Sequence, residues 1–314
     1  MDTVTHGLIG AVVARSGFRQ RLGAPATVAL VTGVLLPDID FVMGFFDQMA
    51  AVKYHRGLTH SLIGGIPLAM LAAVLLRKWY GTASYWTLTG LVYLGVGLHT
   101  LSDLPTSYGT MIFFPLSTKR YALDWVFIMD PVYTAILVAG LALGWWQPER
   151  AQGYARASLV TLCLYITMAG VAHQVALARF RDELTARGIR PVQVAMFPEL
   201  PGLLRWQGVA QDGATFYESR HALWDWDRSG LTVETYRNQV SDKELARVAR
   251  LDEVHAYLQF ARFPWVQVKG SPTRRILEFR DLRFGSHGRR DSFLLRVILE
   301  DNRGEPQVSF THHF

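Results

Sequence analysis

The apolar first part of the chain gathers its few ionisable residues in short phrases that could bind a metal ion. Residues 1–178 contain only eight carboxylates and five histidines. Most of them fall in five phrases, which read MDTVTHG, LLPDIDF, YHRGLTHS, GLHTLSD and LDWVFIMDP. Imidazole and carboxylate groups without a thiolate suit Zn²⁺, Mn²⁺ or Fe²⁺ in a site that leaves a position open for water and substrate. Ionisable groups at membrane depth are costly and usually mark a functional site, so the pattern indicates a divalent-metal centre.

The spacing inside these phrases predicts how the side chains converge. His99 and Asp103 lie four residues apart, so they share one face of a helix and can bind the same ion. Asp38 and Asp40 follow a proline at a helix end, where one of the two carboxylates can point inward. His60 stands at the beginning of the next helix, after a threonine that can cap it.

Six apolar segments must position these residues. A transmembrane helix needs about 20 apolar residues, with roughly 17 as the lower limit. We therefore predict an α-helical membrane domain with four long helices and a short N-terminal pair. The six segments span residues 5–14, 23–36 with a continuation to 46, 61–76, 84–101, 131–146 and 157–178.

Alternating these helices across a membrane brings the histidines and carboxylates to one face. The turns at 15–21, 77–83 and 147–156 then fall on the opposite side. Those turns carry seven basic residues, which are Arg15, Arg19, Arg21, Arg77, Lys78, Arg150 and Arg156. The site side carries Lys53, Arg56, Lys119 and Arg120. The positive-inside rule therefore favours a cytoplasmic basic side and an extracytoplasmic site.

The rest of the chain has the composition of a water-soluble domain. Of the 58 charged residues, 39 lie after residue 178. Short alternating stretches separated by Gly, Pro, Asp and Asn predict a mainly β, α+β domain. The segment 241–261 predicts one amphipathic helix with Ser241 as its N-cap. We place a membrane domain at 1–180 and a soluble domain at 190–314, with the soluble domain on the same side as the site.

The bulk composition excludes several classes of protein. The single cysteine, Cys163, excludes an intramolecular disulfide and a cysteine-type zinc site. The net charge of +6 comes without a basic helix or an interleaved arginine and aromatic platform, so we expect no nucleic-acid partner. The basic residues are expected to lie beside anionic lipid headgroups instead.

The phrases MDTVTHGLIG, LLPDIDF, YHRGLTHS and GLHTLSD, in this order, resemble the signature phrases of the YdjM family. The family consists of bacterial inner-membrane proteins described as membrane-bound metal-dependent hydrolases. It is in turn similar to the zinc-dependent phospholipase C and P1 nuclease group in a His…Asp…His…His-x-x-x-Asp order. That resemblance implies the ligands His6, Asp38 or Asp40, His55 or His60, His99 and Asp103. The group's downstream histidines have no counterpart in DLPTSYGTMIFFP, so we expect one or two ions instead of three.

A metal held in this way would supply a water of lowered pKa for hydrolysis. Asp40 is the candidate to orient or deprotonate that water, and Arg56 is the candidate to neutralise a phosphate. A site at the membrane face favours a phospholipid or another lipid-linked phosphoester as substrate. Two alternatives stay open, which are an ion- or proton-coupled transporter and a non-catalytic membrane scaffold with a structural metal site.

Overall fold

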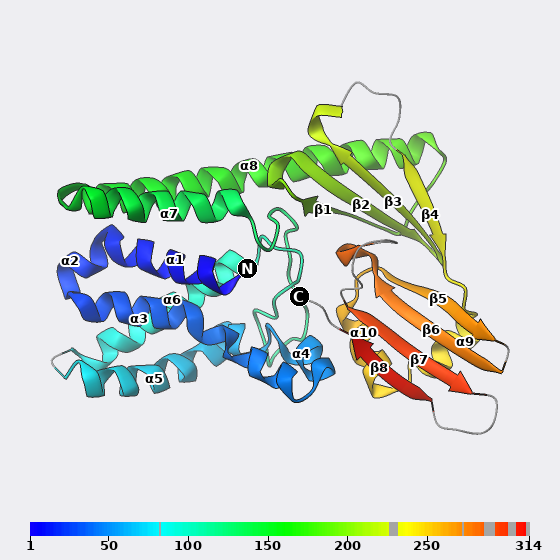
Figure 1. The fold of residues 1–314 in the computed structure, drawn as a ribbon, viewed down its shortest axis with the longest axis horizontal. Helices are drawn as coiled ribbons and strands as arrows, with labels where there is room; N and C mark the ends of the chain where they lie inside the picture. The colour runs from blue at the N-terminus through cyan, green and yellow to red at the C-terminus, as the bar shows by residue number, and fades with distance from the viewer. Residues whose placement is uncertain (82, 226–231, 272, 286–292, 301–305, 312–314) are drawn as a thin grey trace. The chain divides into compact units, whose positions relative to one another are not determined.

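The computed structural model describes residues 1–81, 83–225, 232–271, 273–285, 293–300 and 306–311 (Figure 1). Its contacts divide the chain into two compact units. The first unit contains residues 1–40, 56–174 and 198–205, and the second contains residues 41–55, 175–197 and 206–314.

The first unit is mainly helical, and its helices match the predicted apolar segments. The N-terminal pair consists of α1 (Thr3–Val13) and α3 (Ala24–Leu35), joined by a π turn (Ala14–Phe18) and the short α2 (Arg19–Leu22). The four segments predicted as long helices form α5 (Leu62–Trp79), α6 (Tyr85–Asp103), α7 (Pro131–Trp146) and α8 (Ala151–Ala186). A 3-10 helix (Leu36–Phe45) extends α3. The predicted helical membrane domain is therefore confirmed.

Three helices in the described part of the chain are long and apolar enough to cross a membrane. They are Ala24–Phe45, Leu62–Trp79 and Pro148–Ala186, and Pro131–Trp146 is a shorter apolar helix. The first of them corrects the prediction in one respect. Because the 3-10 helix continues α3 without a break, the second N-terminal helix reaches 22 residues and is not short.

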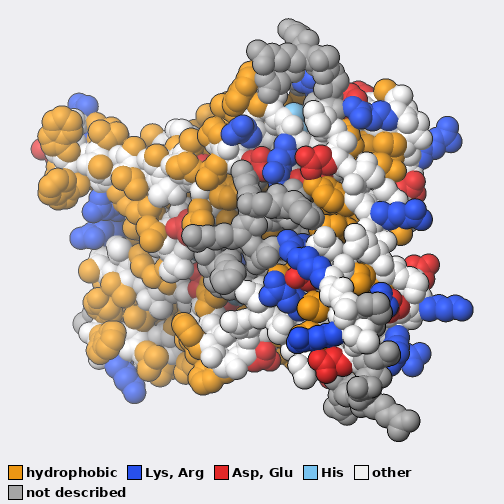
Figure 2. Space-filling model, turned by 45° about the vertical axis from the view of Figure 1, so that its right-hand side comes forward, with side chains coloured by type: hydrophobic (Ala, Val, Ile, Leu, Met, Phe, Trp, Pro, Cys, Tyr) orange, Lys and Arg blue, Asp and Glu red, His pale blue; other side chains and the backbone are white. Residues whose placement is uncertain are grey.

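The outer surface of α5 has the composition of a helix that faces lipid. Its small residues, such as Gly64, Ala69 and Ala73, face inward, whereas large apolar residues such as Leu71 and Leu75 are exposed. This arrangement is typical of membrane helices, where small residues allow close packing and large ones face lipid. Figure 2 shows the same apolar covering over much of the helical unit.

The closest packing in the first unit joins α3 to α6. A Cβ atom added to Gly33 would lie 2.2 Å from the carbonyl oxygen of Val92 and 2.9 Å from the Cα of Gly95. Gly95 is equally close to α3, since a Cβ there would lie 2.7 Å from the Cα of Gly33. The two backbones therefore touch through a glycine pair, which holds the ends of α3 and α6 in a fixed relation.

The second unit contains two antiparallel four-stranded sheets in which the strands follow their sequence order. The first sheet consists of β1 (Gln193–Glu199), β2 (Arg205–Asp212), β3 (Thr215–Ala222) and β4 (Val233–Arg237). The second consists of β5 (Pro264–Ser271), β6 (Arg274–Asp281), β7 (Leu294–Glu300) and β8 (Gln307–Thr311). The prediction of a mainly β, α+β second part is confirmed.

Three short helices accompany the sheets, namely α4 (Gln48–Tyr54), α9 (Asp242–Val248) and α10 (Asp252–Phe260). The prediction of one continuous helix over 241–261 is therefore wrong, because two helices lie there. Ser241 does cap the first helix by accepting a hydrogen bond from the backbone N–H of Glu244. The backbone is extended at Leu251, and a second helix begins at Asp252. Asp252 and Glu253 lie in its first turn, where acidic side chains stabilise a helix by interacting with its dipole.

Glu278 is the most strongly perturbed acid of the second sheet. Its side chain is buried and lies 2.9 Å from each of Lys269, Arg280 and Arg296 on the same face. Burial by itself raises the pKa of Glu278, but the three cations outweigh burial and lower this pKa from its ordinary 4.5 to about 2. The charged form of Glu278 therefore stabilises the folded sheet.

We expect Glu278→Gln to lower the stability of the full chain at pH 7 by about 2 kcal/mol. Because the pKa of Glu278 is lower in the folded chain than in the unfolded chain, its carboxylate contributes its full stabilisation above about pH 4.5. This contribution is lost as the pH falls through the folded-state pKa of about 2. Near-UV circular dichroism of thermal unfolding between pH 7 and pH 2 measures the difference. Glu300→Gln is the control, because that half-exposed carboxylate pairs with Arg274 in the same sheet and should contribute under about 1 kcal/mol. A pH-independent effect of Glu278→Gln would contradict the prediction.

Candidate metal centre

The last turn of α6 carries the centre of the cluster. Nε2 of His99 lies 3.4 Å from Oδ2 of Asp103, one helical turn later, and 3.6 Å from Oδ1 of Asp38. The opposite ring nitrogen, Nδ1, lies 2.7 Å from the carbonyl oxygen of Val34 in α3. A carbonyl oxygen can only accept, so Nδ1 of His99 must carry the proton. Nε2 of His99 is therefore the nitrogen that faces the two carboxylates and is available to a metal ion.

His6, from α1, stacks on His99 and has the same protonation pattern. The two ring centroids are 3.7 Å apart, with an interplanar angle of 15°. The Ser102 hydroxyl donates its hydrogen to the carbonyl oxygen of His99 and lies 3.1 Å from Nδ1 of His6. Because a serine hydroxyl has one hydrogen, Nδ1 of His6 must be the donor in the second contact. Nε2 of His6 is left with its lone pair, 3.4 Å from Oδ1 of Asp103.

His60, in the 3-10 turn before α5, repeats the arrangement. The hydroxyl of Thr59 donates to Oδ2 of Asp40 at 2.7 Å and lies 3.0 Å from Nδ1 of His60. Its hydrogen is already given to Asp40, so Nδ1 of His60 is again the donor. Nε2 of His60 faces Oδ1 of Asp38 at 3.6 Å. The three histidines thus present the same ring nitrogen to the carboxylates.

The 3-10 helix after α3 places its two aspartates on different sides of His60. Oδ1 of Asp38 faces Nε2 of His60 at 3.6 Å, whereas Oδ2 of Asp40 lies 3.3 Å from Nδ1. Asp40 also accepts a hydrogen bond from the backbone N–H of Arg56. The sequence left open which carboxylate points inward. In the structure, Asp38 faces the ligand nitrogens and Asp40 holds the outer side of the ring.

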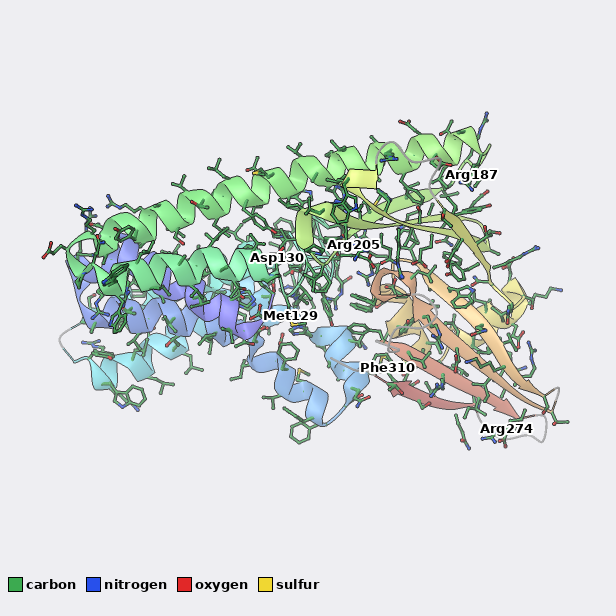
Figure 3. All side chains as sticks on the ribbon, turned by 45° about the horizontal axis from the view of Figure 1, so that its top comes forward. Met129, Asp130, Arg187, Arg205, Arg274 and Phe310 are labelled. Carbon is green, nitrogen blue, oxygen red and sulfur yellow. The ribbon has the colours of Figure 1, made fainter. Side chains whose placement is uncertain are left out.

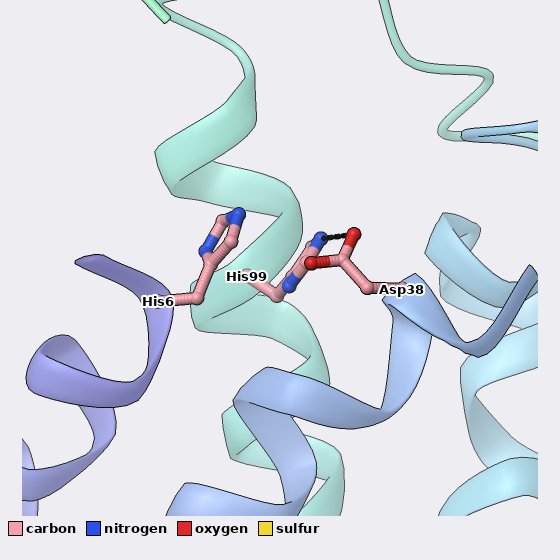
Figure 4. A group of neighbouring side chains, drawn as sticks. All are labelled: His6, Asp38 and His99. Carbon is pink, nitrogen blue, oxygen red and sulfur yellow. Dashed lines mark ion pairs between the residues drawn. The ribbon is translucent and has the colours of Figure 1, made fainter. Parts of the chain in front are cut away.

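The donor atoms fit a divalent metal ion. Nε2 of His6, Nε2 of His99 and Oδ2 of Asp103 are buried and accept no hydrogen bond from the described residues. Ligand atoms of His6, Asp38 and His99 lie within 4.8 Å of one another (Figure 4). Those of His60, His99 and Asp103 do so as well. Buried polar atoms normally find partners, so this convergence of imidazole nitrogens and carboxylate oxygens fits a metal ion. Because both groups include His99, the cluster has room for one or two ions.

Arg56 contacts the cluster from the outer side. Arg56 is buried, and its backbone has a φ of 61°. Nη2 of its guanidinium lies 2.9 Å from Oδ1 of Asp103. Nη1 donates to the hydroxyl of Thr106 at 2.9 Å, and the ring of Tyr108 lies 4.9 Å from the guanidinium carbon. The amine nitrogen of Met1 also contacts Oδ1 of Asp103. Oδ1 of Asp103 therefore pairs with the guanidinium of Arg56, whereas Oδ2 faces His60 and His99.

One residue that the sequence singled out caps a helix and does not join the cluster. Asp130 stands where α7 begins (Figure 3), and its Oδ1 accepts the backbone N–H groups of Val132 and Tyr133. Its Oδ2 accepts the hydroxyl hydrogen of Tyr165, so Asp130 caps a helix and does not join the cluster. His55 ends α4 in the second unit, with its ring 4.1 Å from that of Phe41.

The histidine pKa values follow from burial and neighbouring charge. Burial is the largest influence on His6 and lowers its pKa to about 4, which keeps its ring neutral. Burial also lowers the pKa of His60, but its contacts with Asp38 and Asp40 outweigh burial and raise this pKa. The carboxylates therefore favour positive charge at this place in the fold.

Sequence reasoning did not predict the residues that orient the histidines. It expected Thr59 to cap the helix at His60, but the N-cap of α5 is Ser61, whose side chain accepts a hydrogen bond from the backbone N–H of Gly64. Ser102 and Thr59 stand inside the quoted phrases, each next to a predicted ligand, and that adjacency was a usable signal. The carbonyl oxygen of Val34 carries no signal, because any residue offers one. Such outer contacts fix the tautomer and direction of a metal-binding histidine.

The fold and the site define a multi-pass helical membrane protein with a buried cluster of histidine and aspartate. The YdjM inner membrane protein family model matches residues 1–176, and the chain belongs to this family. The chain is also similar to the uncharacterized protein YfhP of Bacillus subtilis (strain 168), with 23% identity over 297 residues that cover 92% of this chain and 88% of the relative. No solved structure matches. The further similarity to the phospholipase C and P1 nuclease group is not borne out by these comparisons.

Proposed function

We propose that this protein is a membrane-bound metal-dependent hydrolase that cleaves a lipid-linked phosphoester. The observation that carries the proposal is the shared protonation pattern of His6, His60 and His99. Each ring gives its Nδ1 proton to a protein acceptor and turns Nε2 toward Asp38 or Asp103. The nitrogen that each ring offers to a metal ion is therefore Nε2, and the neighbouring carboxylates would complete the ligand set.

The proposed ligands are His6, Asp38, His60, His99 and Asp103, with His55 as a further candidate from the sequence. A bound Zn²⁺, or alternatively Mn²⁺ or Fe²⁺, would supply Lewis acidity and a water of lowered pKa. Asp40 was predicted to act on that water directly. Its contacts with Thr59 and Nδ1 of His60 support a positioning role instead, in which Asp40 holds the ring of His60 in its ligand orientation.

Arg56 is the proposed partner of the substrate phosphate. Its guanidinium lies at the edge of the cluster, and its Nε forms no hydrogen bond with the described residues. A phosphoryl oxygen could therefore pair with Arg56 while Asp103 shares its charge with the metal. This arrangement places positive charge where a phosphoester gains negative charge during hydrolysis.

A lipid-linked substrate is supported by the position of the cluster in the helical unit. Asp38 follows α3, His60 precedes α5 and Asp103 ends α6, so the ligands sit at the ends of apolar helices. A phosphoester at the membrane face lies at this depth. The basic turns at the other ends of these helices support an extracytoplasmic site.

The test uses the purified full chain in detergent with a fluorogenic phospholipid in mixed micelles and a soluble aryl phosphodiester. We expect divalent metal at about one or two per chain and phosphoester hydrolysis that EDTA abolishes and added Zn²⁺, Mn²⁺ or Fe²⁺ restores. His60→Gln should lower kcat/KM by about 100-fold or more, whereas His255→Gln, in the second unit, should leave it unchanged.

Other outcomes would favour the remaining functions. Bound metal with no hydrolysis, together with unfolding on EDTA treatment, would indicate a scaffold with a structural metal. Proton or metal flux into proteoliposomes without hydrolysis would indicate a transporter. Absence of stoichiometric metal would overturn the proposal.

A further inference from the structure

A second site lies at the other end of α1 from the metal centre. A pocket of about 380 Å³ opens between the π turn that follows α1 and the turn that joins α7 to α8. The described residues that line it are Arg15, Arg19, Gln20, Gly144, Trp145, Pro148 and Ala151.

Contacts from two other helices hold the walls of this pocket. Nε of Arg156 and Nε2 of Gln152, both in α8, donate to the carbonyl oxygen of Ser16 inside the π turn at 2.9 and 3.2 Å. Arg15 donates through Nη1 to the carbonyl oxygen of Leu141 in α7 at 3.3 Å. The π turn is therefore tied to both α7 and α8, and the pocket is part of the packed helical unit.

The lining of the pocket is basic. Arg15 and Arg19 lie four residues apart and both border it, and no carboxylate is among the lining residues that the structure describes. Neither arginine forms an ion pair within the described residues. Two uncompensated guanidinium groups beside one cavity favour an anion, and phosphate matches their planar donor geometry.

Tryptophans place this pocket at a membrane–water interface. Trp79 ends α5, Trp86 lies in the first turn of α6, and Trp145 and Trp146 end α7. Their exposed fractions are 82%, 70%, 80% and 77%. Exposed tryptophans at helix ends form the aromatic belt that lies at headgroup level. Trp145 also lines the pocket, so the cavity opens at the depth of lipid phosphates.

We propose that this pocket binds the phosphodiester headgroup of an anionic phospholipid. The two arginines pair with the phosphate, and the Trp145 ring packs against the glycerol and the first acyl carbons. Basic pockets between helix ends bind lipid headgroups by this combination of charge and apolar contact. The site is separate from the metal centre and does not depend on its chemistry.

The full chain, purified in detergent, is titrated with phosphatidylglycerol, phosphatidylcholine or inorganic phosphate, and bound lipid is measured by native mass spectrometry. We expect retention of phosphatidylglycerol but not of phosphatidylcholine. The double variant Arg15→Gln/Arg19→Gln should lower bound phosphatidylglycerol at least about fivefold. Arg77→Gln/Lys78→Gln removes the same charge from the exposed end of α5, outside the pocket, and should change binding less than about twofold.

Three results would overturn the proposal. Equal loss in the two double variants would mean that binding follows diffuse charge. Equal retention of phosphatidylcholine would show that the pocket does not select a lipid with a net negative charge. Displacement of the lipid by equimolar inorganic phosphate would show that the pocket binds free phosphate. Trp145→Ala keeps both arginines and should also lower retention of phosphatidylglycerol, so the test stands if the arginine variant fails to fold.

Discussion

Asp103→Asn is expected to leave the purified protein with less than about a tenth of its bound divalent metal. Asp103 contributes Oδ2 to the group with His60 and His99, and an amide is a much weaker ligand for Zn²⁺ than a carboxylate. Mutation of an outer contact of a metal ligand weakens metal affinity by about 10–100-fold, so the loss of a ligand itself should cost at least as much. Elemental analysis of the full chain after gel filtration measures the metal per polypeptide.

The variant has a second consequence that must be separated from the first. An amide in place of the Asp103 carboxylate would leave the buried guanidinium of Arg56 without its counter-charge, which costs about 3–5 kcal/mol of stability. His99→Gln removes a neutral ligand and creates no unpaired charge, so it should lose metal while keeping more of the fold. His173→Gln is the matched control, since this buried histidine of α8 lies outside the candidate metal groups in the described residues. Full metal content in His99→Gln would contradict the assignment.

Gly33→Leu is expected to disrupt the helical unit and, with it, the metal centre. A side chain at residue 33 would meet backbone atoms of α6, with the carbonyl oxygen of Val92 2.2 Å from the new Cβ. Backbone cannot rotate away as a side chain can, so α3 and α6 must separate, at a cost of about 3 kcal/mol or more. Separation also breaks the hydrogen bond from His99 to the carbonyl oxygen of Val34. The expected result is a lowered Tm together with loss of bound metal.

Gly90→Leu is the control for this prediction. Residue 90 also lies in α6, but a Cβ atom there would meet nothing within 4 Å. The same glycine-to-leucine change should therefore leave Tm and metal content close to those of the unchanged protein. A tolerant Gly33→Leu, measured by thermal unfolding and elemental analysis, would show that the helices are not held by this glycine pair.

Much of the site could be predicted because charged side chains are costly inside a membrane and are therefore rare in membrane helices. Once the chain is seen to be apolar, the few histidines and aspartates stand out, and alternating helices must bring them to one face. His99 and Asp103 required only the helical repeat. Asp38 and Asp40 could not be told apart, because their directions depend on the 3-10 helix and on where His60 lies beside it. Asp130 has the same residue type but caps α7, a role that appears only when the neighbouring backbone is placed.

The helical membrane part, the β-rich second part and the phrases that supply the candidate metal ligands could all be predicted from the sequence. Those features depend on composition and on short-range periodicity, which every residue carries with it. The ring nitrogen that each histidine presents, and the carboxylate that it faces, could be assigned only once the chain was folded. Those properties depend on hydrogen bonds between segments far apart in the chain, such as the one from His99 to Val34, and on the glycine contact that brings α3 against α6.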